Sequence, residues 1–218
     1  IDAAYARVEK VLRRALASLP ESQVDFDVDG HHALARSAAE KAVVLLSNDG
    51  VLPLATATKV AVIGEFARTP RYQGAGSSRV NPTRVDNALD RIAELVGHPV
   101  PFAPGFTTAP KQVLDAGAHD VAVALAEDAE VVLMFMGLGE SHESEGYDRT
   151  TLDLPAEQVA LLDDVLAVNP NVVVVLSNGS SVVLPFATKV RAVVERLLLG
   201  QAGGPVLADV LYGRVNPS

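Results

Sequence analysis

The sequence predicts an α/β fold in which a mainly parallel sheet carries helices on both faces. Short β-branched runs, such as residues 59–64 and 172–176, have the composition of strands that are buried on both sides. Segments with helical periodicity separate these runs, which is the pattern of βαβ units. A chain of 218 residues with 49% hydrophobic content is also long enough to bury a sizeable core.

The first part of the chain is expected to differ from the rest. Apolar residues recur at helical spacing over residues 1–19, and charged residues fill the opposite side, which indicates an amphipathic helix that needs a surface to pack on. Residues 20–30 are polar and turn-rich, as in a linker, and a second helix is expected over residues 31–46. The expected division is therefore a terminal helix with its linker, residues 1–30, and an α/β domain, residues 31–218.

Strands and helices alternate through the expected α/β domain. The strands are predicted at residues 59–64, 99–103, 130–136, 172–176 and 190–195, and the helices at residues 87–96, 113–128, 156–168 and 205–211. Two loops follow predicted strand ends: a glycine-rich loop within residues 71–82 and an acidic loop within residues 137–155. Because ligands of such sheets bind outside the carboxyl ends of the strands, these two loops are the candidates for a functional site.

Composition excludes several classes of function. A formal net charge of -9 and a pI near 5.0 argue against a nucleic-acid partner, which needs a basic surface. The chain has no cysteine, which excludes disulfides and thiolate chemistry. No apolar run reaches membrane-spanning length, so no membrane partner is expected. The cytoplasm is slightly favoured as the compartment. The compartment is otherwise left open, because the chain resembles a fragment and a fragment could lack any targeting signal.

The start of the acidic loop suggests two cofactor classes, and neither fits. Gly137 and Gly139 follow a strand as in a dinucleotide-binding turn, but the third glycine of that pattern is replaced by His142. His142 also lies between Glu140 and Glu143, as a metal ligand could, yet the other four histidines fall in segments with no reason to converge on it. No metal and no cofactor is therefore predicted.

The glycine-rich loop carries Ser77 and Ser78 directly after Gly76. A serine nucleophile needs a Gly-x-Ser-x-Gly turn and a base, and this loop does not have that pattern. Hydrogen bonding to a ligand suits the two serines better. The triplet of Asn178, Gly179 and Ser180 matches a glycosylation acceptor, but a turn after a strand explains it equally well.

The carboxylates of residues 143–149 are the remaining candidates for chemistry. Glycoside cleavage uses a pair of Asp or Glu residues, one of which acts as acid and then as base. Glu145 and Asp148 are close in sequence, but Asp148 beside Arg149 is more easily interpreted as an ion pair that braces the loop and lowers the pKa of the aspartate. A solvated acidic surface loop is the alternative interpretation.

Several stretches resemble the second, α/β-sandwich domain of glycoside hydrolase family 3, typified by β-glucosidases. The resemblance spans almost the whole chain in the right order, and the stretches that carry it are residues 35–54, 60–64, 74–78, 145–155 and 200–218. The motif with the most chemical content is Glu145-Gly146-Tyr147-Asp148-Arg149, which is similar to the acid/base loop of that family.

The resemblance implies a role for each candidate residue. Glu145 matches the general acid/base of a retaining, exo-acting β-glycosidase, with Glu143 as the fallback and as a neighbour whose charge raises the pKa of Glu145. Ser77 matches a serine that reaches the bound sugar, with Ser78 as the near alternative and Gly76 beside them. The sugar and its linkage are left open.

The resemblance also implies a missing half of the site. The nucleophilic aspartate belongs to a preceding (β/α)8 barrel of the same polypeptide, of which residues 1–19 would be the last helix, and so this chain alone is expected to be inactive. Without the barrel, Glu145 is expected to be solvated with a near-normal pKa.

Two alternative functions remain: a non-catalytic carbohydrate-binding or interface domain of the same fold, and a nucleotide-dependent α/β enzyme.

Overall fold

The computed structural model describes residues 1–20, 25–77, 79–108 and 117–218. The chain forms two compact units, residues 1–31 and residues 32–218. The first unit contains the helix α1 (Asp2–Ala17), none of whose residues is buried. Its large apolar side chains are exposed, Val11 and Leu16 by 66% each. The amphipathic helix predicted at the start of the chain is thus present, and the assignment of residues 1–30 to a preceding barrel stays a prediction.

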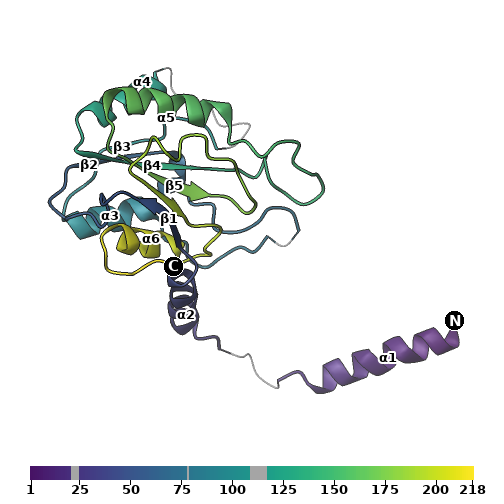
Figure 1. The fold of residues 1–218 in the computed structure, drawn as a ribbon. Helices are drawn as coiled ribbons and strands as arrows, with labels where there is room; N and C mark the ends of the chain where they lie inside the picture. Colours follow the sequence, from purple (N-terminus) through teal and green to yellow (C-terminus); the bar gives the residue numbers. More distant parts are fainter. Residues whose placement is uncertain (21–24, 78, 109–116) are drawn as a thin grey trace. The chain divides into compact units, whose positions relative to one another are not determined.

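The second unit is built on one six-stranded sheet with the strand order β1-β6-β5-β4-β2-β3 (Figure 1). All neighbouring strands are parallel except β1, which pairs antiparallel with β6. The strands are β1 (Val44–Asn48), β2 (Val60–Ile63), β3 (Phe102–Ala103), β4 (Val131–Gly137), β5 (Val172–Ser177) and β6 (Ala192–Glu195).

Helices cover both faces of this sheet, as predicted. In Figure 1, α4 and α5 lie over one face, and α3 and α6 lie over the other. Their bounds are α3 (Ala88–Val96), α4 (Ala118–Glu127), α5 (Ala156–Val168) and α6 (Gly203–Leu211), while α2 (Val28–Glu40) precedes the first strand. The predicted α/β fold class is therefore confirmed. In the described ranges, no helix combines the length and the apolar content that crossing a membrane requires.

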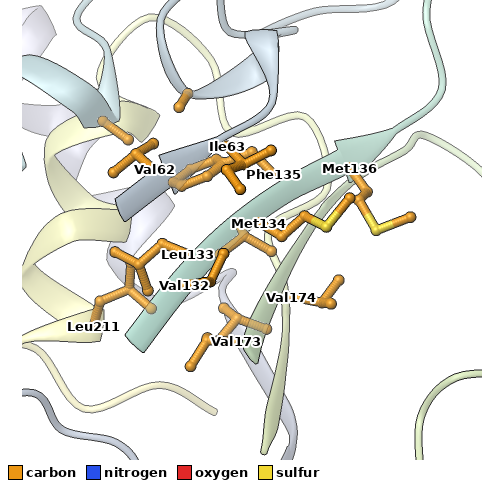
Figure 2. Packing of buried hydrophobic residues seen from close by; sticks show 14 of the residues in the cluster. Val62, Ile63, Val132, Leu133, Met134, Phe135, Met136, Val173, Val174 and Leu211 are labelled. Carbon is orange, nitrogen blue, oxygen red and sulfur yellow. The ribbon is translucent and has the colours of Figure 1, made fainter. Parts of the chain in front are cut away.

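The core lies around the two central strands. Every residue of β4 and β5 is buried, because parallel strands flanked by helices have no solvent-facing side. Figure 2 shows Leu133, Phe135 and Val173 of these strands among the buried side chains of the sheet and its helices, together with Leu211 of α6. Each such side chain contributes roughly 1.5 to 3 kcal/mol when it is fully buried.

The strand β1 was not predicted. Residues 44–46 were expected to end the second helix, but α2 ends at Glu40 and the chain then turns into an extended edge strand. Short apolar runs fit a helix and a strand equally well, and here antiparallel pairing with β6, including Val44 opposite Glu195, decides the outcome. The predicted start of α4 at residue 113 falls in the segment 109–116, which lies outside the described residues.

Glycines allow the chain to leave two strands at the carboxyl edge of the sheet. Gly64, directly after β2, has φ +107°, and a Cβ added there would lie 2.1 Å from the carbonyl oxygen of Phe135 in β4. A Cβ on Gly137 would likewise lie 2.0 Å from the carbonyl oxygen of Ser177 in β5. No side chain can occupy these positions without moving the neighbouring backbone.

Replacing Gly64 by alanine should therefore destabilise the fold by about 2 to 4 kcal/mol, because the backbone clash adds to the cost of a positive φ. The matched control is Gly97→Ala, since Gly97 also has a positive φ, +83°, but nothing lies within 4 Å of its added Cβ. Gly97→Ala should cost about 1 kcal/mol. Urea unfolding of both variants measures the difference, and equal costs would show that the close approach to Phe135 is unimportant.

Candidate active site

The two candidate loops meet at the carboxyl edge of the sheet. The glycine-rich loop follows β2, the acidic loop follows β4, and a third loop follows β5. They surround a hollow of about 310 Å³. Its lining residues are Arg71, Gly74, Ala75, Glu143, Ser144, Glu145, Gly179 and Leu198. The position confirms that both loops follow strand ends and adds the loop after β5 to the site.

The carboxylate of Glu145 lies against the glycine-rich loop. Its Oε2 accepts hydrogen bonds from the backbone N–H of Ser77, at 2.9 Å, and from the hydroxyl of Ser77. Gly76 permits this approach, because a Cβ at that position would lie 2.6 Å from Cβ of Glu145. Three of the predicted site residues are therefore in contact with one another. Ser78, the fourth, lies outside the described residues.

These contacts set the charge of Glu145. The hydroxyl of Ser77, followed by its backbone N–H, lowers the pKa of the Glu145 carboxyl, because both donors favour the ionised form. The side chain is solvated, as expected, but its pKa is lowered rather than near normal. In this structure the ionised form of Glu145 is therefore favoured, and it acts as a hydrogen-bond acceptor.

Glu143 faces the interior, two residues before the exposed Glu145. Its Oε2 lies 2.6 Å from Nη1 of Arg71, and the two side chains are only 10% and 7% exposed. The backbone N–H of Gly179 donates to both carboxylate oxygens at 3.0 and 2.9 Å, and the hydroxyl of Ser180 donates to Oε1 at 2.7 Å. Glu143 thus fastens the acidic loop to the loops that follow β2 and β5.

Burial by itself would raise the pKa of Glu143, but the hydrogen bonds from Ser180 and Gly179 and the charge of Arg71 outweigh burial and lower it. The negative charge of Glu143 is compensated by these partners, and Glu143 is not among the groups that shift the pKa of Glu145. The expectation that Glu143 raises the pKa of Glu145 is wrong for this reason.

The loop is braced by Arg149, but not in the way that the sequence suggested. Nη1 of Arg149 donates to the hydroxyl of Ser180 at 2.7 Å and to the carbonyl oxygen of Ser181 at 2.9 Å. Asp148 and Arg149 are both among the described residues, and no ion pair joins them. The predicted Asp148–Arg149 brace is therefore wrong: the guanidinium reaches the loop after β5 instead of the adjacent carboxylate.

Besides the contacts of Glu143 and Arg149, a third set of contacts holds the start of the acidic loop. Glu140 forms an exposed ion pair with Arg79, and its carbonyl oxygen accepts a hydrogen bond of 2.6 Å from the hydroxyl of Tyr147. The carbonyl oxygen of Leu138 accepts a hydrogen bond of 2.5 Å from Arg71. The acidic loop is consequently tied at both ends, with Glu145 between the ties.

Sequence reasoning missed Arg71, Gly179 and Ser180 as parts of the site. Arg71 and Glu143 are 72 positions apart, and no local pattern pairs residues at that distance. The only usable signal was topological, because the loops after neighbouring parallel strands meet at one edge of the sheet. The described residues contain no group of three histidine, aspartate or glutamate side chains that could hold a metal ion.

Breaking the buried pair should cost far more than breaking the exposed one. Glu143→Gln leaves the charge of Arg71 buried without compensation and should lower the free energy of unfolding by about 3 kcal/mol. The matched control, Glu140→Gln, removes an exposed Glu–Arg pair of the same loop and should cost less than about 0.5 kcal/mol. Chemical denaturation of both variants tests this, and a similar small cost for both would mean that the pair does not anchor the loop.

The same pair should make stability depend on pH. Because the pKa of Glu143 is lower in the folded than in the unfolded chain, its contribution is fully present above the unfolded value, about 4.3, and is lost as the pH falls through the folded value. The difference in unfolding free energy between the wild-type chain and Glu143→Gln should therefore shrink as the pH falls from 7 to 3. A constant difference over that range would contradict the lowered pKa.

Comparison with known proteins shows the family of this chain. The family model described as "Glycosyl hydrolase family 3 C-terminal domain" matches residues 43–218. An exo-alpha-(1->6)-L-arabinopyranosidase from Bifidobacterium longum is 50% identical over 95% of this chain, and a thermostable beta-glucosidase B from Acetivibrio thermocellus is 42% identical over 100% of it. The chain spans 29% of the length of each of these relatives.

A solved structure of a family 3 beta-glucosidase from Bifidobacterium adolescentis has the same fold. It superposes with a TM-score of 0.84 and 52% identity, covering 94% of this chain and 30% of that one. The family model covers most of the α/β unit, from the turn before β1 to the last residue. The resemblance detected in the sequence is therefore confirmed: this chain belongs to glycosyl hydrolase family 3, as the C-terminal domain of that family.

Proposed function

We propose that this chain is the acid/base-bearing domain of a retaining, exo-acting β-glycosidase and that Glu145 is its general acid/base. The observation that carries the proposal is the solvent-exposed carboxylate of Glu145, held against Ser77 and Gly76 at the carboxyl edge of the sheet. The family membership and the glycosidase names of the relatives support the reaction class. Terminal β-linked sugars are the proposed substrates.

In the proposed reaction Glu145 first protonates the glycosidic oxygen as the bond to the sugar breaks. A second carboxylate attacks the sugar carbon and forms a covalent glycosyl-enzyme, and Glu145 then removes a proton from the water that releases the sugar. In this chain the second carboxylate of the site, Glu143, is committed to Arg71, Gly179 and Ser180. We therefore assign the nucleophile to a preceding barrel domain, and the chain alone should be inactive.

The lowered pKa of Glu145 suits the second step, in which Glu145 accepts a proton from water. It does not suit the first step, in which Glu145 donates a proton to the glycosidic oxygen. A general acid must hold its proton near the working pH, which requires a raised pKa. If a bound sugar takes the hydroxyl of Ser77 and the facing domain covers Glu145, the carboxylate loses a donor and its water together. Both changes raise its pKa, so assembly of the complete site would switch Glu145 toward the acid form.

A second candidate function is a non-catalytic carbohydrate-binding or interface domain. The observation that favours it is the same hydrogen bond, because a carboxylate with a lowered pKa that is already engaged by Ser77 can serve as a polar contact without transferring protons. The two candidates differ in whether loss of Glu145 changes the dependence of the rate on the leaving group.

Glu145→Ala should be studied in a polypeptide that joins this domain to its barrel. Loss of the acid should reduce hydrolysis of aryl glycosides with poor leaving groups by about 10² to 10⁴-fold, and leave the glycosylation step of good leaving groups much less affected. Azide should restore turnover of the good leaving groups by replacing base-activated water. Glu140→Ala, in the same loop and exposed, is the control and should behave as wild type. An equal, small effect on every leaving group would exclude the acid/base role.

Ser77→Ala should move the pKa of Glu145 upward, back toward the ordinary range of a glutamate, because it removes the hydroxyl that stabilises the carboxylate. The measurement is a carbon-detected NMR titration of the glutamate carboxyls in the 218-residue chain. Ser144→Ala, which lies next to Glu145 in the lining of the same hollow, is the control and should leave the pKa unchanged. A pKa of Glu145 that is the same in Ser77→Ala as in the wild-type chain would mean that the hydroxyl does not cause the shift.

A further inference from the structure

Side chains and backbone carbonyls of three loops and of the end of β6 form a closed ring of polar contacts that includes Arg71 and Glu143 of the hollow. Nη2 of Arg196, at the end of β6, donates to the carbonyl oxygen of Arg71 at 3.0 Å. Arg71 holds Glu143, and Glu143 accepts from the hydroxyl of Ser180. Nδ2 of Asn178 then donates to the carbonyl oxygen of Ser180 at 3.0 Å and to Glu195, the residue before Arg196, at 3.1 Å. The contacts therefore return to the strand from which they start.

Arg196 is the most unusual member of this ring. Its side chain is completely buried, and its Nε and Nη1 have no hydrogen-bond partner. Burial lowers its pKa to about 10, and the nearby charge of Glu195 offsets this only in part. An apolar side chain of similar volume is often at least as stabilising as a buried charge, so packing alone gives no reason for a guanidinium at this position.

The backbone next to Arg196 is also strained. Leu197 has φ +52°, the only positive value outside glycine among the described residues. Its N–H donates to Oε1 of Glu195 at 2.7 Å, and the following Leu198 lines the hollow beside Glu145. Strained conformations of this kind persist where the surrounding contacts determine the backbone closely, and they are concentrated at functional sites.

We propose that Arg196 is a positioning residue that holds the glycine-rich loop and the acidic loop in register, so that Ser77 and Glu145 stay in contact. The inference rests on the proposed function of Glu145. The geometry is direct: Arg196 fixes the backbone of Arg71 at the start of the glycine-rich loop, while the guanidinium of Arg71 holds the acidic loop through Glu143. Arg71 thus links the two loops, and Arg196 fixes Arg71.

The proposal gives a reason for a buried arginine at the end of β6. Ser77 and Glu145 come from loops that follow different strands and are 68 positions apart. Catalytic groups lose much of their efficiency when they are misplaced by about 1 Å, so two loops that leave different strands need a common support. The end of β6 can provide it because this strand is part of the sheet core, where Val193 and Val194 are buried.

The test uses Arg196→Met in the 218-residue chain, followed by NMR. Loss of positioning should raise hydrogen exchange of the Ser77 amide about tenfold, because its bond to Glu145 opens more often. It should also move the Glu145 titration toward the ordinary range. Arg196→Lys, which can still reach one carbonyl oxygen, should give intermediate values. Arg191→Met is the matched control, since Arg191 lies at the opposite end of β6 and binds Asp49 and Asn171. It should change neither signal.

Asn178→Ala removes the hydrogen bonds from Asn178 to Ser180 and Glu195 and so interrupts the ring at another point. This variant tests the proposal if Arg196→Met does not fold. It should weaken the Ser77–Glu145 contact in the same two measurements. A lower melting temperature in both variants, with Ser77 exchange and Glu145 titration unchanged, would overturn the proposal and leave Arg196 a purely structural residue. These readouts do not depend on catalysis, so they stay interpretable if the leaving-group experiment on Glu145→Ala excludes the acid/base role.

Discussion

The buried ion pair between Arg71 and Glu143 is the contact on which the geometry of the site depends. It joins the two loops that follow β2 and β4, and the side chains of Arg71 and Glu143 are only 7% and 10% exposed, respectively. Charges that are removed from water in this way are tolerable only when further hydrogen bonds satisfy them. Glu143 accepts such bonds from Gly179 and Ser180, and Arg71 donates one to the carbonyl oxygen of Leu138. Moving either loop would expose these charged groups or leave them buried without hydrogen-bond partners, so the pair resists movement of both loops.

The difference between Glu143 and Glu145 is one of environment rather than of chemistry. Both carboxyls have a lowered pKa, but Glu143 is ionised inside the protein against a guanidinium, whereas Glu145 is ionised in water against a serine. The first arrangement is costly to disturb and suits a structural anchor. The second can be changed by a ligand or a facing surface at little cost, which is what a group that must gain and lose a proton requires.

The pattern of apolar residues was enough to predict most of the fold, because the central strands and their helices are strongly periodic. α5 spans residues 156–168, the predicted bounds, and β2 and β4 differ from their predicted bounds by one or two residues. β1 could not be recognised, since its apolar residues continue the helical pattern of α2 and its strand conformation comes from pairing with β6.

The site was predicted only in part for the same physical reason. The two loops could be marked from their composition, but Glu145, Ser77 and Gly76 were singled out within them by the resemblance to family motifs, and the structure places these three residues in contact. The partners of Glu143 and Arg149 were not found, because they come from the loop after β5 and from Arg71, which are distant in sequence. The Asp148–Arg149 pair shows the opposite error: neighbours in sequence were assumed to interact, while the backbone directs Arg149 toward Ser180 and Ser181.

Most charged side chains of the site are hydrogen-bonded within the α/β unit, whereas one carboxylate is exposed, and this difference indicates what the complete site needs. Glu143, Arg71 and Arg149 have their main contacts within the α/β unit, and they hold loops rather than present charge to a ligand. Glu145 is the carboxylate of the hollow that remains exposed, and its partner Ser77 can exchange one acceptor for another. A retaining glycosidase requires a second carboxylate about 5 to 5.5 Å away, on the other side of the scissile bond. Because Glu143 is already paired with Arg71, we propose that in the reaction assigned above this second carboxylate comes from outside this unit, on the side where Glu145 is open to solvent.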